Sequence, residues 1–232
     1  MRVEVKDLRK SYDKEVLNIK ELFFKEGRIT AIVGPNGSGK STLLNIIATT
    51  LNKDEGEVLY DQKAKAPLSQ MTIVFQKPYL IDASVRSNLS YPLKIRHIPK
   101  ETIEKEVQKI AASLNITDLL KKNAHDLSIG EKAKVSLARA LIFKPELLLL
   151  DEPCASLDPF TTSEIEKTLG FINQKEKTTI ILITHDLGEA KRIADEMVLL
   201  NKGRVVSKNS KEAFFKDDDP LVKKFINGEL LI

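Results

Sequence analysis

Cysteine, tryptophan and long apolar runs are scarce or missing in this chain of 232 residues, which has one cysteine and no tryptophan. Cys154 has no second cysteine with which to form an intramolecular disulfide. The three histidines lie too far apart in the sequence to give, with Cys154, the ligand spacing of a zinc site. The apolar runs at 147–150 and 180–183 end after four residues, whereas a membrane helix needs about 20. A disulfide scaffold and a membrane-spanning protein are therefore excluded.

The chain also lacks an apolar signal segment and any run of five or more charges of one sign. Its first residues, M-R-V-E-V-K-D-L, place a charge at every second or third position, so nothing directs export and we expect a cytoplasmic protein. Subtracting 33 acidic from 37 basic residues leaves a net charge of +4. This mild basicity indicates no nucleic-acid partner, although its sign suits a protein beside an anionic membrane leaflet.

Short apolar strand patterns alternate with helical patterns through most of the chain, which is typical of an α/β fold with a mainly parallel sheet. Residues 3–8 and 17–23 indicate an antiparallel β layer on the N-terminal side. From 78 to 143 the strand signals stop and apolar residues recur at helical spacing. We expect one domain over 1–232, with a core at 1–77 and 144–232 and a helical subdomain inserted at 78–143. The core strands are expected at 29–33, 147–150, 179–184, 197–200 and 205–207.

Residues 34–41 read G-P-N-G-S-G-K-S and fit the phosphate-loop pattern G-x-x-x-x-G-K-[ST] (Walker A) at every fixed position. A buried strand precedes the loop and a helical pattern follows it, which a chance glycine turn with an incidental lysine would not explain. In such a loop the backbone N–H groups face the phosphates, Lys40 reaches the β and γ phosphates, and the Ser41 hydroxyl is a ligand for Mg²⁺. The candidate nucleotide-binding residues are Gly34, Pro35, Asn36, Gly37, Ser38, Gly39, Lys40, Ser41 and Thr42. The expected fold is that of a P-loop nucleotide hydrolase, and 1–77 with 144–232 form its nucleotide-binding core.

Two carboxylates, Asp151 and Glu152, follow directly on the buried strand at 147–150. Without a phosphate loop they would be interpreted as an acidic turn. With it, Asp151 is the candidate that holds Mg²⁺ through water, and Glu152 is the candidate catalytic residue that polarises the attacking water.

Small-molecule kinases, GTPases and transport ATPases all share these two elements. A GTPase needs an Asn-Lys-x-Asp motif well after the loop. Residues 52–55, N-K-D-E, have the acid one place early and begin only 12 residues past Lys40. The remaining motifs, in chain order, are Gln76 after M-T-I-V-F, L-S-I-G-E at 127–131, S-L-D at 156–158, and His185 after I-I-L-I-T. Over essentially its whole length the chain resembles the ATP-binding subunit of an ABC transporter.

The resemblance implies roles that spacing alone does not give. Tyr12 would stack on adenine, although an isolated tyrosine is equally well explained by packing. Gln76 would touch Mg²⁺ or the attacking water, and His185 would contact the γ-phosphate, although a histidine after a buried strand is more often only a capped strand end. Asp158 would couple two active sites. The signature at 127–131 would complete the site of a second copy through Ser128, Gly130 and Glu131, so that two ATP molecules lie between two chains.

The resemblance also implies partners and a place in the cell. The pore would be a separate transmembrane permease, with a solute-binding protein acting indirectly, and this chain would lie peripherally on the cytoplasmic face of the cell membrane. A separate pore is more usual for importers, and residues 75–78 and 84–91 are similar to stretches in phosphate and tungstate or molybdate importers. The alternatives are import of another small solute such as an amino acid, or a soluble non-transport ABC ATPase. The signature departs from the family's L-S-G-G-Q at Ile129 and Glu131.

Overall fold

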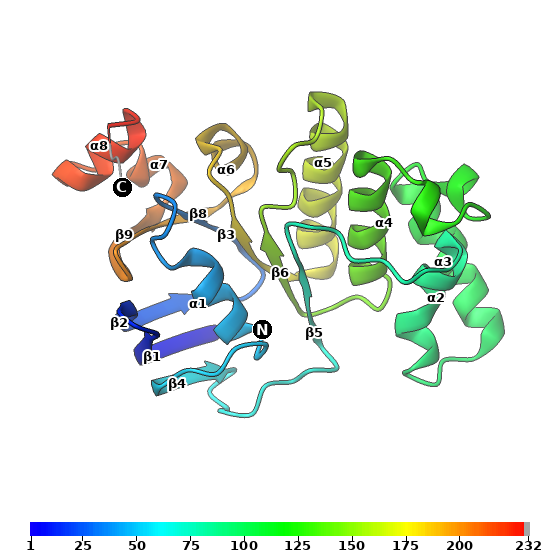
Figure 1. Cartoon of the computed structure of the whole chain (residues 1–232), viewed down its shortest axis with the longest axis horizontal. Coiled ribbons are helices and arrows are strands. Elements are labelled where there is room, and N and C mark those ends of the chain that lie inside the picture. The colour runs from blue at the N-terminus through cyan, green and yellow to red at the C-terminus, as the bar shows by residue number, and fades with distance from the viewer. Residues whose placement is uncertain (230–232) are drawn as a thin grey trace.

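The computed structural model describes residues 1–229, which form two sheets flanked by helices (Figure 1). The smaller sheet is antiparallel in the order β2-β1-β4, and the larger has six strands in the order β5-β6-β7-β3-β8-β9. In the larger sheet only the pair β8–β9 is antiparallel. The strands are β1 Val3–Ser11, β2 Glu15–Phe24, β3 Ile29–Val33, β4 Glu55–Tyr60, β5 Met71–Val74, β6 Leu147–Asp151, β7 Thr179–Ile183, β8 Glu196–Asn201 and β9 Arg204–Ser210.

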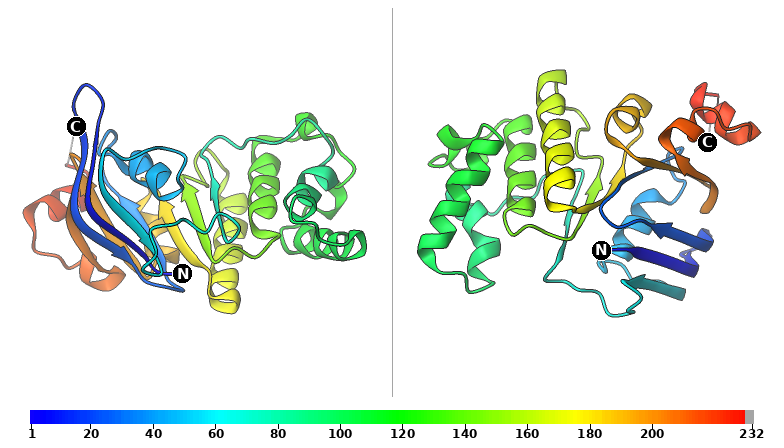
Figure 2. Two further views of the ribbon diagram at one scale, coloured as in Figure 1. Left: turned by 90° about the horizontal axis from the view of Figure 1, so that it is seen from below. Right: turned by 180° about the vertical axis from the view of Figure 1, so that it is seen from behind.

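The helices lie around the larger sheet and at the end of the molecule far from β1 and β2 (Figures 1 and 2). No strand of either sheet lies between β5 and β6, where the structure describes every residue and places α2, α3 and α4. None of the helices within 1–229 has both the length and the apolar character needed to cross a membrane. The α-helices are α1 Lys40–Ile47, α2 Val85–Lys94, α3 Lys100–Ser113, α4 Ile129–Leu141, α5 Pro159–Glu176, α6 Leu187–Ile193, α7 Lys211–Phe214 and α8 Pro220–Ile226, with 3₁₀ turns at Thr117–Leu119 and Ala124–Asp126.

The central strands β3, β6, β7 and β8 of the larger sheet are buried on both faces, which explains why they are largely apolar in sequence. Alternate residues of β6 enter different cores because successive side chains of a strand point to opposite faces. Leu147 and Leu149 pack in the core shared with α1 and the smaller sheet. Leu148 and Leu150 pack in the core shared with α2, α3, α4 and α5. The central strands are thus fixed on both sides, and their carboxyl ends form a rigid edge.

The predicted α/β class, the antiparallel layer and the central strands are confirmed. The third strand of the antiparallel layer, β4, was missed. Its first three residues, Glu55–Gly56–Glu57, are exposed and polar, and only Val58 and Tyr60 are buried. Because β4 is held by pairing with β1, with Val3 opposite Tyr60 and Val5 opposite Val58, its local pattern carries little signal.

Candidate functional site

The glycine-rich turn at 34–39 joins the end of β3 to the start of α1, as the sequence predicted. Gly34, Gly37 and Gly39 have φ values of 147°, 74° and 100°. Residues with a side chain rarely adopt this backbone conformation. A Cβ on Gly34 would lie 2.0 Å from the carbonyl oxygen of Leu200. The loop can therefore wrap closely only because these positions carry no side chain, and a tight loop of this kind at a helix start is suited to bind an anion through its N–H groups.

Lys40 is the first residue of α1 and is 6% exposed. Its Nζ donates hydrogen bonds to the carbonyl oxygens of Gly34 at 2.8 Å and Pro35 at 2.9 Å. Burial lowers the pKa of the Lys40 ammonium, and the nearby Glu152 and Asp151 carboxylates act in the opposite direction. The ammonium is thus held inside the curve of the loop, where a phosphate would meet it.

Ser41 and Asp151 are brought together across 110 residues of sequence: the Ser41 hydroxyl donates to Asp151 Oδ1 at 3.2 Å. Asp151 ends β6, and burial raises the pKa of its carboxyl while the Ser41 hydrogen bond lowers it. A hydroxyl and a carboxylate oxygen beside a phosphate loop are ligands of the kind that Mg²⁺ takes together with phosphate oxygens and water. The donor set therefore fits Mg²⁺.

Glu152 forms a small cluster with two residues from other loops. Its Oε2 accepts a hydrogen bond from Gln76 Nε2 at 3.1 Å and lies 3.1 Å from His185 Nδ1. The Glu152 backbone has a φ of 47°, in the left-handed region, and its N–H donates to Ile183 at 3.0 Å. A positive φ in a non-glycine residue is found where the surroundings fix it, often at functional sites. Three predicted residues separated by 33 or more positions therefore meet at one carboxylate oxygen.

The signature begins α4. Ser128 is its N-cap and forms a capping box with Glu131: the Glu131 N–H donates to Ser128 Oγ at 3.2 Å, and the Ser128 N–H donates to Glu131 Oε2 at 2.7 Å. The backbone hydrogen bond from Ser128 is the main cause that lowers the pKa of Glu131. The carboxylate of Glu131 is thus turned back onto its own helix end, where negative charge is favourable.

Ile129 is the first residue of α4, has no left-handed backbone and is 65% exposed. A β-branched residue disfavours positive φ, and the helical backbone at this position suits isoleucine. We expect Ile129→Gly to change the ATPase rate by less than about threefold, which is under roughly 0.7 kcal/mol in the barrier, because no contact of the capping box uses the Ile129 side chain. Steady-state rates at saturating Mg-ATP check this, and a large gain in rate would instead show that isoleucine impairs the signature.

Asp158 and Tyr12 are placed apart from the Glu152 cluster. Asp158 is the N-cap of α5 and accepts hydrogen bonds from the Thr161 N–H at 3.0 Å and the Thr161 hydroxyl at 2.7 Å. A Cβ on Gly130 would lie 3.4 Å from Thr161 Oγ1, so the starts of α4 and α5 are neighbours. Tyr12 follows β1, is 62% exposed, and has Lys10 Nζ 5.4 Å from its ring centroid. Within 1–229 no hydrogen bond links Tyr12 or the Ser128 side chain to the phosphate loop.

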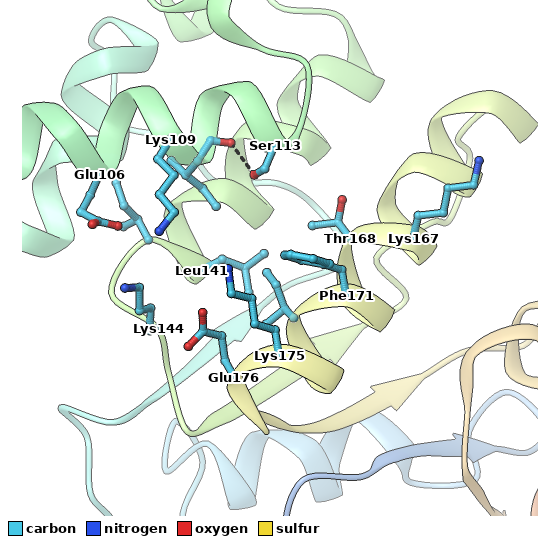
Figure 3. A pocket seen from close by; sticks show the side chains of 13 residues that line it. Glu106, Lys109, Ser113, Leu141, Lys144, Lys167, Thr168, Phe171, Lys175 and Glu176 are labelled. Carbon is cyan, nitrogen blue, oxygen red and sulfur yellow. Dashed lines mark hydrogen bonds between the residues drawn. The ribbon is translucent and has the colours of Figure 1, made fainter.

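A cavity of about 420 Å³ borders Glu152, Ser156 and His185 and extends to Glu166, Glu189 and Arg192. No sequence pattern selects these last three residues, because only the packing of α5 against α6 brings them together. A separate cavity of about 260 Å³ lies between α3, the end of α4 and α5, with Phe171 and Leu141 in its wall (Figure 3). None of the predicted site residues lines it.

A phosphate loop after one parallel strand, with paired carboxylates at the end of another strand of the same sheet, defines a P-loop nucleotide hydrolase. Residues 17–155 match the family described as ABC transporter. The chain belongs to this family and is an ATPase of its ATP-binding cassette type.

Relatives and solved structures agree with this assignment. The chain is 45% identical over 207 residues to the tungstate uptake system ATP-binding protein of Peptoclostridium acidaminophilum, covering 88% of this chain and 97% of that protein. It is 35% identical to a phosphate import ATP-binding protein of Natronomonas pharaonis, covering 93% and 82%. The structure of cbiO1 from Clostridium perfringens, part of an ABC transporter complex, matches with a TM-score of 0.84 at 32% identity, covering 97% and 94%. A dimeric ATP-binding cassette bound to ADP and Pi matches with a TM-score of 0.83 at 28% identity, covering 90% and 98%.

Proposed function

We propose that this chain is the ATP-hydrolysing subunit of an importer and drives an oxyanion through a separate transmembrane permease. The oxyanion that we propose is tungstate. It lies peripherally on the cytoplasmic face of the membrane, and a solute-binding protein delivers the oxyanion to the permease. The meeting of Gln76 and His185 at Glu152, beside the Ser41–Asp151 contact, is the observation that supports hydrolysis. The relative named as the ATP-binding protein of a tungstate uptake system is 45% identical, against 35% for the phosphate import relative, and this supports tungstate as the cargo.

Each predicted residue then has a task in phosphoryl transfer to water. Lys40 and the loop N–H groups bind the β and γ phosphates, and Tyr12 stacks on adenine. Mg²⁺, held by Ser41, Asp151 and Gln76, would neutralise charge on the phosphate oxygens. Glu152 orients the attacking water and accepts its proton, while Gln76 and His185 fix the Glu152 carboxylate and His185 faces the γ-phosphate.

We further propose that the site is complete only in a dimer of this chain. Ser128, Gly130 and Glu131 lie at the start of α4, and the α4 N-terminus is suited to meet the γ-phosphate bound by the second copy. Asp158, at the neighbouring start of α5, faces the same interface. ATP then holds the two chains together, and hydrolysis releases them.

A shallow cavity of about 410 Å³ beside β5 is proposed as the docking site of the permease. It is lined by Ile81, Tyr91 and Ile95 from the segment around α2, and by Phe143 after α4. Tyr91 and Ile95 are 49% and 55% exposed, and exposed apolar clusters of this kind mark protein interfaces. In this proposal residues 78–143 form the helical subdomain that transmits movement between the permease and the nucleotide.

The test uses this chain co-expressed with the membrane subunit encoded beside it and reconstituted in vesicles that enclose the ATPase side. We expect co-purification, and ATPase activity that rises when tungstate and the binding protein are added outside. Ile95→Glu should lower this stimulation by at least about tenfold, a loss of about 1.4 kcal/mol in coupling, because it replaces one of the exposed apolar side chains of this cavity with a charged one. Basal activity should stay within about twofold of wild type, since α2 lies outside the phosphate site.

Phe171→Glu is the matched control, because Phe171 is 59% exposed on α5 in the other cavity (Figure 3). It should keep full stimulation. An equal loss of stimulation in both variants would show that the permease does not dock at the cavity beside Ile95. An active ATPase that associates with no membrane subunit would contradict the importer and favour a soluble non-transport ABC ATPase. Stimulation by phosphate or an amino acid instead of tungstate would change the cargo alone.

A further inference from the structure

Arg192, near the end of α6, forms the tightest link between the two helices that follow the loops of the site. Its Nε lies 3.1 and 2.9 Å from the two carboxylate oxygens of Glu166 on α5, and its Nη2 lies 2.7 Å from Oε1. The same Nη2 is 3.6 Å from Oδ2 of Asp186. Asp186 is the N-cap of α6 and directly follows His185. One guanidinium therefore contacts both α5 and the loop that carries His185.

The surroundings make this guanidinium hard to replace. The cavity of about 420 Å³ next to it is lined by four acids, Glu152, Glu166, Asp186 and Glu189, and Arg192 is the only lysine or arginine in that lining. Glu166 is 8% exposed and Glu189 is 3% exposed, with Glu189 Oε1 lacking a hydrogen-bond partner among the described residues. The Arg192 side chain is half-exposed, so its loss would leave the buried Glu166 carboxylate without a charged partner in a site that water can still reach. The Glu166 carboxylate thus depends on Arg192.

Gly188, in the first turn of α6, provides the space for this arrangement. A Cβ there would lie 2.9 Å from Asp186 Oδ1 and 3.0 Å from Arg192 Nη1. The Gly188 N–H donates to Asp186 Oδ1 at 2.7 Å. Gly188 does not have a left-handed backbone, so no turn requires glycine at this position. The absence of a side chain instead leaves room for Asp186 and Arg192 to come close.

The two helices joined in this way start at different parts of the proposed site. α5 begins at Asp158, which faces the second copy, and α6 begins after His185, which faces the γ-phosphate of the same chain. A bidentate contact between a planar guanidinium and a carboxylate fixes both distance and angle. A displacement of α5 at the dimer interface therefore moves the His185 loop with it.

We propose that Arg192 is a positioning residue that couples the dimer-facing loop at 156–158 to His185 through Glu166 and Asp186. The inference rests on the roles proposed above for His185 and Asp158. Arg192 touches neither nucleotide nor water in this scheme. It fixes the position of His185, and with it the contact between His185 and Glu152, when the second copy binds.

A mutant cycle between Arg192→Gln and His185→Ala tests the coupling. We expect Arg192→Gln to lower kcat by about tenfold and to change the KM for ATP by less than about twofold, because the phosphate loop is untouched. In the His185→Ala background Arg192→Gln should cause no further loss, since its effect passes through His185. Arg192→Lys should recover only part of the rate, because one ammonium cannot reproduce the fork. Lys191→Gln, which removes a neighbouring charge of α6, should behave as wild type.

Two further measurements separate positioning from a merely structural role. The chain has three histidines, so the ring resonances of His185 can be assigned by NMR, and they should shift in Arg192→Gln and in Gly188→Ala but not in Lys191→Gln. The double variant Glu166→Gln/Arg192→Gln removes both charges and keeps the test possible if Arg192→Gln alone unfolds. The proposed coupling would be overturned if the losses in kcat of Arg192→Gln and His185→Ala multiplied in the double variant. It would also be overturned if the His185 resonances were unchanged in Arg192→Gln. An inactive wild-type chain would contradict the proposed function instead.

Discussion

Replacing Glu152 by glutamine will lower ATP turnover by at least about 100-fold, within the range that a general base contributes, while ATP binding is kept. Glutamine has nearly the same shape, so Lys40 and the loop N–H groups still hold the phosphates. It cannot accept the proton of the attacking water, and the contact of His185 with a negative Oε2 is lost. With hydrolysis blocked, the ATP-bound dimer should accumulate, which sedimentation at saturating Mg-ATP will detect.

Glu146→Gln is the control for this experiment, because Glu146 precedes the same strand β6 at its other end, where it binds Gln70 at 2.7 Å. It should turn over ATP as wild type does and show no stable dimer. Sedimentation of Glu152→Gln as a monomer only, together with intact hydrolysis, would remove Glu152 from its proposed role.

Ser128→Arg is expected to abolish the part of the ATPase activity that depends on dimerisation. In the proposed dimer, an arginine side chain would fill the place where the start of α4 meets the γ-phosphate bound by the second copy. The measurement is specific activity against protein concentration: wild type should rise as the dimer forms, and Ser128→Arg should stay flat at the background rate.

Replacing Ser128 also removes the N-cap of α4. Ser128 caps α4 through Glu131, so its replacement also costs about 1 kcal/mol of helix stability. Ser128→Ala removes the cap and the hydroxyl without filling the interface, so it should lose stability and keep a reduced activity that still rises with protein concentration. If Ser128→Arg kept wild-type turnover, the signature would not be part of the site.

Much of the site could be predicted because its strongest signals are local. The phosphate loop is eight consecutive residues whose glycines meet left-handed backbone and close contacts. The strand before Asp151 is continuously apolar because both of its faces are buried. Lys40, Ser41, Asp151 and Glu152 were therefore found from chemistry and spacing. Gln76, Asp158, His185 and the signature were found only through resemblance, since each is an ordinary polar residue in its own sequence neighbourhood.

The sequence by itself determined the α/β class, the phosphate loop, the helical insert and the identity of the paired carboxylates, because periodicity and turn chemistry act over a few residues. Only the tertiary structure decided which distant residues meet. The strand β4 forms because it pairs with β1. Glu152 contacts Gln76 and His185 because β5, β6 and β7 end at one edge of the sheet. The Arg192–Glu166 pair likewise follows from the packing of α5 against α6. These contacts join residues whose own segments are stable for other reasons, so no local sequence pattern predicts them.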